Sequence, residues 1–254
     1  MKAGFFMRKQ CDLSIIVPCL NEAENIEQVL NNILHVIDTI PSCTSEIVVV
    51  DDQSEDDTFS ITENYITTRC LQDRVHLVKR DLRRRGYGAV VRYGVANAYG
   101  RYVIFVSADM VDPIEHLPRF FKMMEDGADL VQCSRYTNDG DTNTIPFIYK
   151  FWQFFYRRFV KWILGTNLRD TTYAFKMFKR TDLLALGLTQ NRFSISPEIT
   201  FKVLLSNGKV ESFAAPQGTR VFGISKFRFT KEAFGYGYVL LRAFLHRMGL
   251  IFWF

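Results

Sequence analysis

Cysteine is scarce in this chain, and its distribution argues against two common kinds of site. The 254 residues include only five cysteines, which are scattered, form no CxxC pair and lie near no histidine cluster. An odd and scattered set is poorly suited to a disulfide framework or to a structural zinc site. We therefore expect reduced thiols, as in a cytosolic protein.

Long apolar runs are also missing. No segment reaches the ~18 to 20 uncharged apolar residues that a membrane-spanning helix needs. The amino-terminal residues, MKAGFFMRKQCDLSIIVPCL, show no long apolar stretch followed by a small-residue cleavage site. We expect a chain that stays on the cytoplasmic side of a membrane, either soluble or attached peripherally to the membrane surface.

Charge and histidine content narrow the function further. The formal net charge of +5 is too small to indicate nucleic-acid binding without a concentrated basic stripe, although it favours an anionic membrane surface. The four histidines fall outside the acidic turns described below, and no Ser/His/Asp arrangement is visible. These features argue against a nucleic-acid partner and against a serine-hydrolase triad.

The feature that is present is an alternation of strand-like and helix-like segments. Five short segments rich in β-branched residues predict strands buried on both faces: LSIIV (13–17), EIVVV (46–50), VHLVK (75–79), YVIFV (102–106) and DLVQC (129–133). Segments with apolar residues at helical spacing lie between them. This alternation predicts an α/β fold with a doubly wound, largely parallel sheet, in which ligands bind beyond the carboxyl ends of the strands.

Three acidic turns follow predicted strands. They are PCLNE (18–22), DDQSEDDT (51–58) and SADMVD (107–112). Taken singly, each turn can be explained as a cap of the next helix, and for Asp112 we favour a cap of the helix that starts near Pro113 over a metal contact. Together, carboxylates at one sheet edge repel one another unless a metal or a hydrogen-bonding ligand compensates them. The turns therefore predict a ligand site.

Two segments with few acidic residues indicate a membrane surface. Residues 147–165, FIYKFWQFFYRRFVKWILG, place Lys150, Gln153, Arg157 and Lys161 on one helical face and aromatic residues over most of the rest. This pattern predicts an amphipathic helix at a membrane interface, and the alternative is a buried helix whose basic stripe faces water. The tail 229–254 ends in an apolar cluster that membrane docking, dimer contacts or the core could cover.

The motifs of the chain together resemble a known family. They are IIVPCLNEAENI, VVVDDQSEDDT, GYGAVVRYGVANAYGRYVIFVSADM, CSRY and RDTTYAFKMFKR. In order and spacing they are similar to those of inverting GT-A glycosyltransferases, the family of dolichyl-phosphate mannosyltransferase and its polyprenyl-phosphate relatives. The resemblance covers residues 13 to about 228. It implies a Rossmann-like GT-A catalytic domain over 1–228 and an amphipathic helical tail over 229–254.

The resemblance also implies roles for the first two acidic turns. Pro18, Asn21 and Glu22 match positions that line the nucleotide pocket. Asp51 and Asp52 match positions that hold the base and the ribose.

At the third turn the chain departs from the family pattern. Asp109 matches the last acid of the DXD motif, which binds Mg²⁺ or Mn²⁺ on the diphosphate of the nucleotide sugar. Ala108 precedes it in the same nucleotide-sugar site. Ser107 stands in place of the first acid, and Val111 replaces a polar metal contact of a relative. Because Mg²⁺ often uses one or two protein carboxylates together with substrate phosphates, a weakened but usable site is compatible with this change.

Further matches lie later in the chain. The resemblance assigns four phosphate-facing residues: Arg135, Arg220, Ser225 and Lys226. Ser225 and Glu198 belong to the acceptor side, and Asp170 matches an acidic position near it. Asp109, Arg135 and Asp170 are thus the expected catalytic residues.

Three functions remain open at this point. The first is transfer of a hexose (mannose favoured over glucose) from a GDP- or UDP-linked sugar to a polyprenyl or dolichyl phosphate, with inversion. No strong base is needed there, because the second pKa of a phosphate monoester is near ~6. The second is transfer to a hydroxyl acceptor, which needs a base such as Asp170 or Glu198. The third is a catalytically inactive nucleotide-sugar-binding or scaffold protein, as Ser107 would allow.

Overall fold

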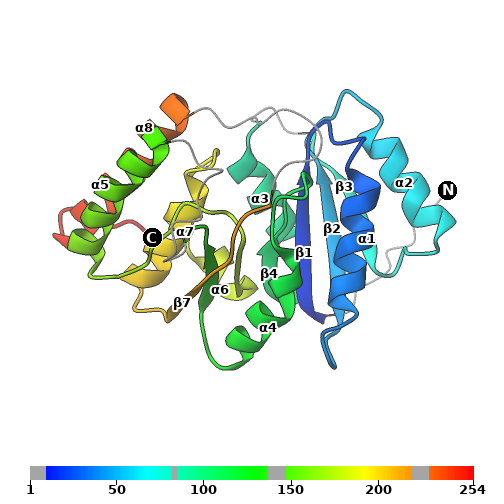
Figure 1. Ribbon diagram of the computed structural model, residues 1–254, viewed down its shortest axis with the longest axis horizontal. Coiled ribbons are helices and arrows are strands. Elements are labelled where there is room, and N and C mark those ends of the chain that lie inside the picture. Colours follow the sequence, from blue (N-terminus) through cyan, green and yellow to red (C-terminus); the bar gives the residue numbers. More distant parts are fainter. Residues whose placement is uncertain (1–9, 82–84, 137–146, 219–228) are drawn as a thin grey trace.

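A seven-stranded sheet forms the centre of the protein. The computed structural model describes residues 10–81, 85–136, 147–218 and 229–254. The strand order is β3-β2-β1-β4-β6-β5-β7 (Figure 1). The strands are β1 (Cys11–Cys19), β2 (Ser45–Asp51), β3 (Val75–Lys79), β4 (Gly100–Phe105), β5 (Leu130–Ser134), β6 (Lys176–Lys179) and β7 (Val210–Ala214). Only β6 runs antiparallel to its neighbours β4 and β5 among the described pairs, so the predicted, mostly parallel sheet is confirmed.

Helices cover both faces of this sheet. They are α1 (Ile26–Ile37), α2 (Thr58–Thr68), α3 (Tyr87–Ala96), α4 (Leu117–Glu125), α5 (Phe147–Leu164), α6 (Arg180–Ala185), α7 (Ile195–Leu205) and α8 (Phe229–Arg247), with a short 3₁₀ turn at Ile114–His116. Alternate residues of β1 explain the two layers. Ile15 packs into the core cluster that includes residues of α1 and α4, while Ile16 packs into the cluster with α3 and α7.

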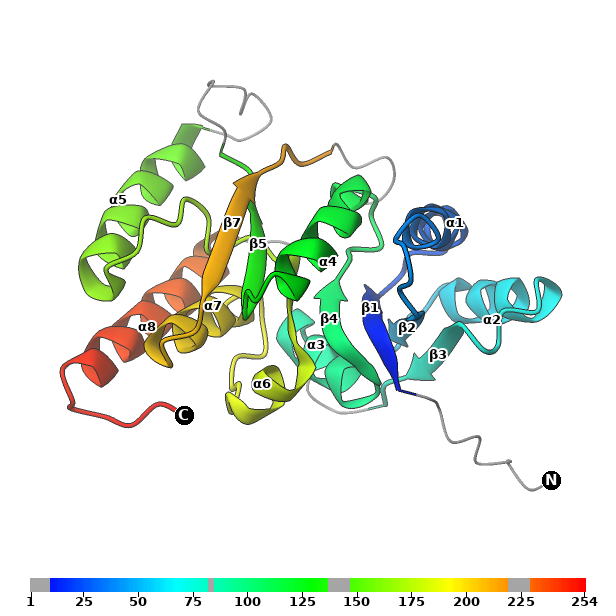
Figure 2. The same cartoon turned by 90° about the horizontal axis from the view of Figure 1, so that it is seen from below.

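The helices α5 and α8 form a separate layer at the β7 end of the sheet. They lie side by side in both ribbon views, next to α7 (Figures 1 and 2). Val160 of α5, Phe201 of α7 and Val239 of α8 share a small buried cluster with Trp253. The tail 229–254 is therefore helical only as far as Arg247, and Trp253 folds back into the core, where it is 2% exposed. Within the described residues, no helix combines the length and apolar character needed to cross a membrane.

Candidate active site

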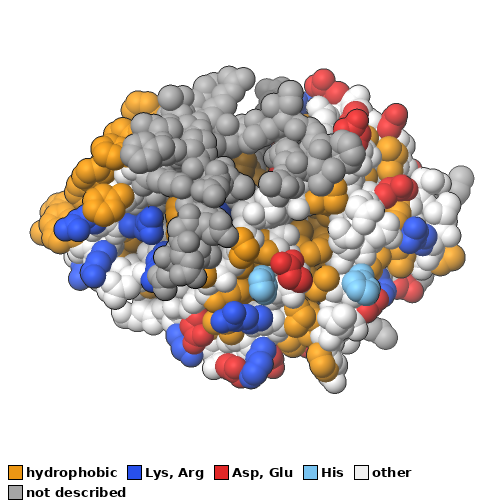
Figure 3. Space-filling model, viewed as in Figure 1, with side chains coloured by type: hydrophobic (Ala, Val, Ile, Leu, Met, Phe, Trp, Pro, Cys, Tyr) orange, Lys and Arg blue, Asp and Glu red, His pale blue; other side chains and the backbone are white. Residues whose placement is uncertain are grey.

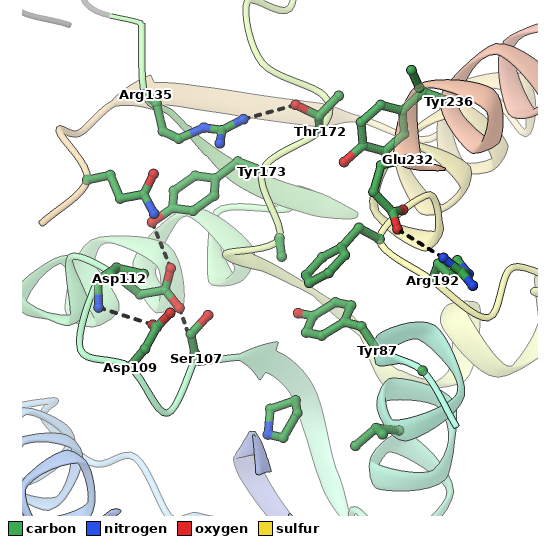
Figure 4. Close-up of a pocket in the computed structure, with 18 of the residues that line it drawn as sticks. Tyr87, Ser107, Asp109, Asp112, Arg135, Thr172, Tyr173, Arg192, Glu232 and Tyr236 are labelled. Atoms are coloured by element: carbon green, nitrogen blue, oxygen red, sulfur yellow. Dashed lines mark hydrogen bonds and ion pairs between the residues drawn. The ribbon is translucent and has the colours of Figure 1, made fainter. Parts of the chain in front are cut away.

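A large cavity opens at the carboxyl ends of the central parallel strands. Its volume is about 1090 Å³, and it lies where a doubly wound sheet is expected to bind ligands. Residues that follow β1, β2 and β4 line it together with side chains from α5 and α8. Figure 4 shows Glu232 and Tyr236 of α8 across the cavity from Ser107, Asp109 and Asp112. All three acidic turns predicted from the sequence therefore meet at one cavity.

Most of the predicted nucleotide-sugar residues line this cavity. They are Pro18, Glu22, Asp52, Ala108, Asp109 and Arg135. Asp52 is 3% exposed, and its carboxylate accepts a hydrogen bond of 2.6 Å from Arg80. This ion pair holds Asp52 at the end of β2.

Two predicted residues support the turns instead of lining the cavity. Asn21 has a positive φ of 54° and accepts a hydrogen bond of 2.8 Å from the Glu55 backbone N–H. Asp51 is 1% exposed and accepts from the Ser54 backbone N–H at 3.4 Å. Asn21 thus ties the turn after β1 to the turn after β2, whereas Asp51 bonds within the turn after β2. Neither residue lines the cavity. Arg220, Ser225 and Lys226 lie outside the described residues.

Asp112 lies in the cavity wall, and the expectation that it caps a helix is wrong. Met110 has a positive φ of 60°, which turns the chain back toward the end of β4. The Asp112 carboxylate then accepts hydrogen bonds from the Ser107 backbone N–H at 2.6 Å and from the Tyr173 hydroxyl at 2.7 Å (Figure 4). The 3₁₀ turn that follows has no side-chain cap. Burial, with a smaller contribution from the charge of Asp109, raises the pKa of Asp112 to about 6.

The same wall has oxygen atoms that could serve as ligands for a hard divalent cation. Asp109 and Asp112 are each 8% exposed and line the cavity together with Ser107. Over the described ranges, no group of three or more His, Cys, Asp or Glu residues could hold a metal on its own. Two carboxylates and a hydroxyl nevertheless fit Mg²⁺ or Mn²⁺, because these ions complete their shells with water and substrate phosphate oxygens. Asp112 thus puts a second carboxylate beside Asp109, although Ser107 removes the expected one.

Asp170 and Arg135 form a buried ion pair beside the cavity. The Arg135 Nε donates to Asp170 at 2.7 Å, and its Nη2 donates to Asp170 at 3.1 Å and to Thr172 at 2.9 Å. Asp170 is fully buried and does not line the cavity. Burial alone would raise the pKa of Asp170, but the Arg135 charge and several hydrogen bonds hold it below its usual range. Asp170 therefore positions Arg135, and the structure does not place it as a base.

Glu198 is also fully buried away from the cavity. Its carboxylate accepts hydrogen bonds from the Thr189 backbone N–H at 3.0 Å and from the Gln190 backbone N–H at 2.9 Å. It also lies 3.6 Å from the Lys202 ammonium. These contacts shape the segment before α7, so the assignment of Glu198 to the acceptor side has no support from its position.

That segment packs closely on the start of α3. A Cβ atom at Gly88 would lie 2.4 Å from the Gln190 carbonyl oxygen, so a glycine is required at this position. The approach brings Phe193 onto Tyr87, with ring centroids 4.8 Å apart and an interplanar angle of 12°. Both rings line the cavity. Sequence reasoning missed this pair, because the only local signal was the glycine spacing in RGYG.

The sequence also provided no indication of three cavity residues that lie on the right of Figure 4. They are Arg192, Glu232 and Tyr236, which come from the segment before α7 and from α8. These residues lie far in sequence from the acidic turns and form no local motif with them. Only the packing of α8 against α7 brings them to the cavity.

The sheet order, the crossovers and the acidic edge define a GT-A fold of the glycosyltransferase type. Residues 14–187 match the model of Glycosyl transferase family 2, and the chain belongs to this family. The resemblance found in the sequence motifs is thereby confirmed.

Relatives with assigned activities match over most of the chain. The chain is 25% identical to a dolichyl-phosphate hexose transferase of Haloferax volcanii over 209 residues, which are 82% of this chain and 84% of the relative. It is 24% identical to a polyprenol monophosphomannose synthase of Mycolicibacterium smegmatis, over 84% of this chain and 79% of that one. A dolichol-phosphate mannosyltransferase of Pyrococcus furiosus is 29% identical, but the match covers only 37% of its length.

Solved structures share the fold. A mannosyltransferase from Pyrobaculum calidifontis in complex with GDP-Man and Mn²⁺ has a TM-score of 0.65 and 20% identity, over 94% of this chain and 65% of that one. Glucosyl-3-phosphoglycerate synthase from Mycobacterium tuberculosis, in complex with Mn²⁺, UDP and glucosyl-3-phosphoglycerate, has a TM-score of 0.63 and 18% identity. The match covers 95% of this chain and 81% of that one. At these identities the likeness concerns the fold alone.

Proposed function

We propose that the protein transfers a hexose from a GDP- or UDP-linked sugar to a polyprenyl or dolichyl phosphate, with inversion, at the cytoplasmic face of a membrane. One observation carries this proposal. The cavity runs from the acidic wall, formed by Ser107, Asp109 and Asp112, to an exposed aromatic surface. Trp152, Phe155 and Phe159 of α5 line the cavity and are still 53%, 43% and 51% exposed. A polar donor and an apolar lipid tail can therefore meet in one space. The named relatives support the same pairing of substrates.

The donor end of the cavity suits a nucleoside diphosphate sugar. Pro18, Glu22 and Asp52 would hold the nucleoside, and Arg135 would face a phosphate. Asp109 and Asp112 would hold Mg²⁺ or Mn²⁺. When bound, such an ion neutralises the charge of the diphosphate leaving group. The Mn²⁺ in both solved relatives supports this cofactor.

The acceptor end favours a phosphate over a hydroxyl group. A phosphate dianion attacks without a general base, and no histidine lines the described part of the cavity. Asp170 and Glu198, the two bases that the sequence offered for a hydroxyl acceptor, are fully buried and do not line the cavity, so their positions do not support that role. Asp112 likewise weakens the case for an inactive site, because it supplies the carboxylate that Ser107 lacks.

The assay that tests this function separates lipid products from soluble ones. Purified protein is incubated with labelled GDP-mannose or UDP-glucose, Mn²⁺ or Mg²⁺, and a short polyprenyl phosphate. We expect label in the organic phase with one donor, and its loss with EDTA. Label that stays with a soluble saccharide acceptor, or donor binding without any product, would contradict the proposal.

Membrane contact through α5 is supported by exposed aromatic rings more than by the basic stripe that the sequence predicted. Gln153 and Arg157 of the predicted basic stripe are half-buried: Gln153 donates to Thr172 at 3.0 Å, and Arg157 lies 4.5 Å from the centre of the Tyr136 ring. The exposed side is mainly aromatic, with Arg158 and Lys161 beside it. Figure 3 shows hydrophobic side chains gathered along the edge where α5 lies. The Lys150 side chain lies outside the described part.

We expect this aromatic surface to bind vesicles. Phe154 and Trp162 are 54% and 69% exposed, so replacing both by serine removes apolar surface without emptying a core. The double variant should bind anionic vesicles at least roughly tenfold more weakly, because each inserted ring contributes about 1 kcal/mol or more. Cosedimentation measures the change. Tyr99→Ser is the matched control, since Tyr99 is 43% exposed just before β4. Unchanged binding of the double variant, or an equal loss in the control, would contradict membrane contact through α5.

A further inference from the structure

A carboxylate of α8 enters the cavity across from the acidic wall. Glu232 lies in the first turn of α8, lines the cavity and is 4% exposed. The Phe193 backbone N–H donates to the Glu232 carboxylate, and Oε1 also lies 3.9 Å from the Arg192 guanidinium, which is longer than a hydrogen bond. The Glu232 Oε2 is buried and has no hydrogen-bond partner among the described residues. A buried carboxylate oxygen without a partner is costly, so its position in a ligand cavity points to a donor on the ligand.

The surroundings of Glu232 suit a sugar ring. The stacked rings of Tyr87 and Phe193 line the same part of the cavity, and Tyr236 lies one helical turn after Glu232 (Figure 4). An ionised carboxylate only accepts hydrogen bonds, so it pairs with hydroxyl donors and repels phosphates. Aromatic faces cover the apolar C–H surface of a pyranose. The combination therefore favours a hexose over a phosphate, and the nucleoside is already assigned to Pro18, Glu22 and Asp52.

Tyr87 connects this wall to the acidic wall. Burial raises the pKa of Tyr87, and the charges of Asp112 and Asp109 raise it further. Tyr87, Asp109, Asp112 and Glu232 line the same cavity, and Figure 4 shows Tyr87 between the two aspartates and Glu232. The Tyr87 ring stacks on Phe193. In a nucleotide sugar the hexose is bonded directly to the diphosphate. With a diphosphate at Asp109, the hexose would occupy the same cavity, across which Glu232 lies.

We propose that Glu232 accepts a hydrogen bond from a hydroxyl of the donor hexose and thereby selects among hexoses. This inference rests on the proposed function, since it takes a nucleotide sugar as the donor. It assigns a subsite to a helix that follows the family-matched residues 14–187. A site built to bond a hydroxyl discriminates strongly against a sugar that lacks it or presents it in another direction.

The test compares binding of a nucleotide with binding of its sugar conjugate, without any acceptor. Calorimetry with Mn²⁺ measures GDP against GDP-mannose, and UDP against UDP-glucose. For Glu232→Ala we expect nucleotide affinity within about twofold of wild type, and affinity for the sugar conjugate lower by roughly 10- to 100-fold, as for a lost hydrogen bond to a charged group. Glu232→Gln keeps one acceptor oxygen, so its loss should be smaller.

Arg192→Gln is the matched control, because it removes the same ion pair and leaves the carboxylate in place. We expect this variant to keep most of the sugar-dependent part of the affinity. Equal effects of the Arg192 and Glu232 variants would overturn the proposal, since they would show that only the ion pair matters. A Glu232→Ala variant that loses nucleotide and sugar conjugate affinity equally, or loses neither, would also overturn it, as would wild-type protein that binds no nucleotide sugar. Failure to form a lipid product would count against the proposed function alone, because the binding test contains no acceptor.

Discussion

Replacing Asp109 by asparagine is expected to lower kcat/KM for hexose transfer by at least about 10³-fold, which corresponds to roughly 4 kcal/mol of transition-state stabilisation. Asp109 lines the cavity, is 8% exposed and follows β4 at the end of a rigid buried strand. Asparagine has nearly the same shape but no charge, so the fold should be kept while the wall loses a carboxylate. The lipid-product assay with saturating Mn²⁺ measures the change.

A second readout separates metal binding from turnover. We expect electron paramagnetic resonance to show weaker Mn²⁺ binding by Asp109→Asn in the presence of a nucleoside diphosphate. Ser107→Ala is the control, because it removes the hydroxyl group and leaves both carboxylates in place, and its activity should stay within about tenfold of wild type. An Asp109→Asn enzyme that works at near wild-type rate without added metal would show that the acidic wall has another purpose.

We expect a large loss of activity for Asp109→Asn and a small one for Ser107→Ala, because we infer that Asp112 stands in for the first acid of the DXD motif. Ser107 stands directly after the buried run that ends at Val106, and its backbone N–H donates to Asp112 at 2.6 Å. The second carboxylate therefore lies beside the position that a first acid would occupy. Ser107→Asp would place a third carboxylate in this wall. We infer that it would raise mutual repulsion in the absence of metal and gain little activity in its presence.

The sequence predicted the sheet better than the site. Runs such as IIV in β1 and IVVV in β2 are buried on both faces, so composition alone identifies them. The strand β6, KMFK, has four residues with a lysine at each end, and its antiparallel pairing depends on two strands distant in sequence. No local pattern could therefore predict it.

The sequence predicted those cavity residues whose position depends only on the turn after a strand. Asp52, Ala108 and Asp109 line the cavity because they directly follow parallel strands, and strand order brings such turns together. Asp112 was assigned to a helix because the positive φ of Met110 cannot be predicted from the residue type. Glu232 was missed because α8 reaches the cavity only through tertiary packing.

Arg135, one of the basic residues that line the cavity, pairs with a buried partner, Asp170. Replacing Asp170 by asparagine is expected to destabilise the protein by about 3 kcal/mol at neutral pH, because a buried ion pair that loses one member leaves an uncompensated charge. We choose the lower end of the usual range because the Arg135 side chain is 23% exposed and can gain water. Chemical denaturation measures the free energy of unfolding. Asp126→Asn is the control, since its pair with Lys122 is 58% and 75% exposed and should contribute less than about 1 kcal/mol.

The dependence on pH distinguishes lost charge from lost packing in this variant. The pKa of Asp170 lies below its usual range in the folded protein, so the unfolded chain takes up its proton at a higher pH than the folded one. The stabilisation by Asp170 is therefore fully present above about pH 4 and is lost as the pH falls through the folded-state pKa. The gap in unfolding free energy between wild type and Asp170→Asn should narrow on acidification. A gap that stays constant from neutral to acidic pH would mean that the asparagine disturbs packing, and that Arg135 does not depend on the charge of Asp170 for its place beside the cavity.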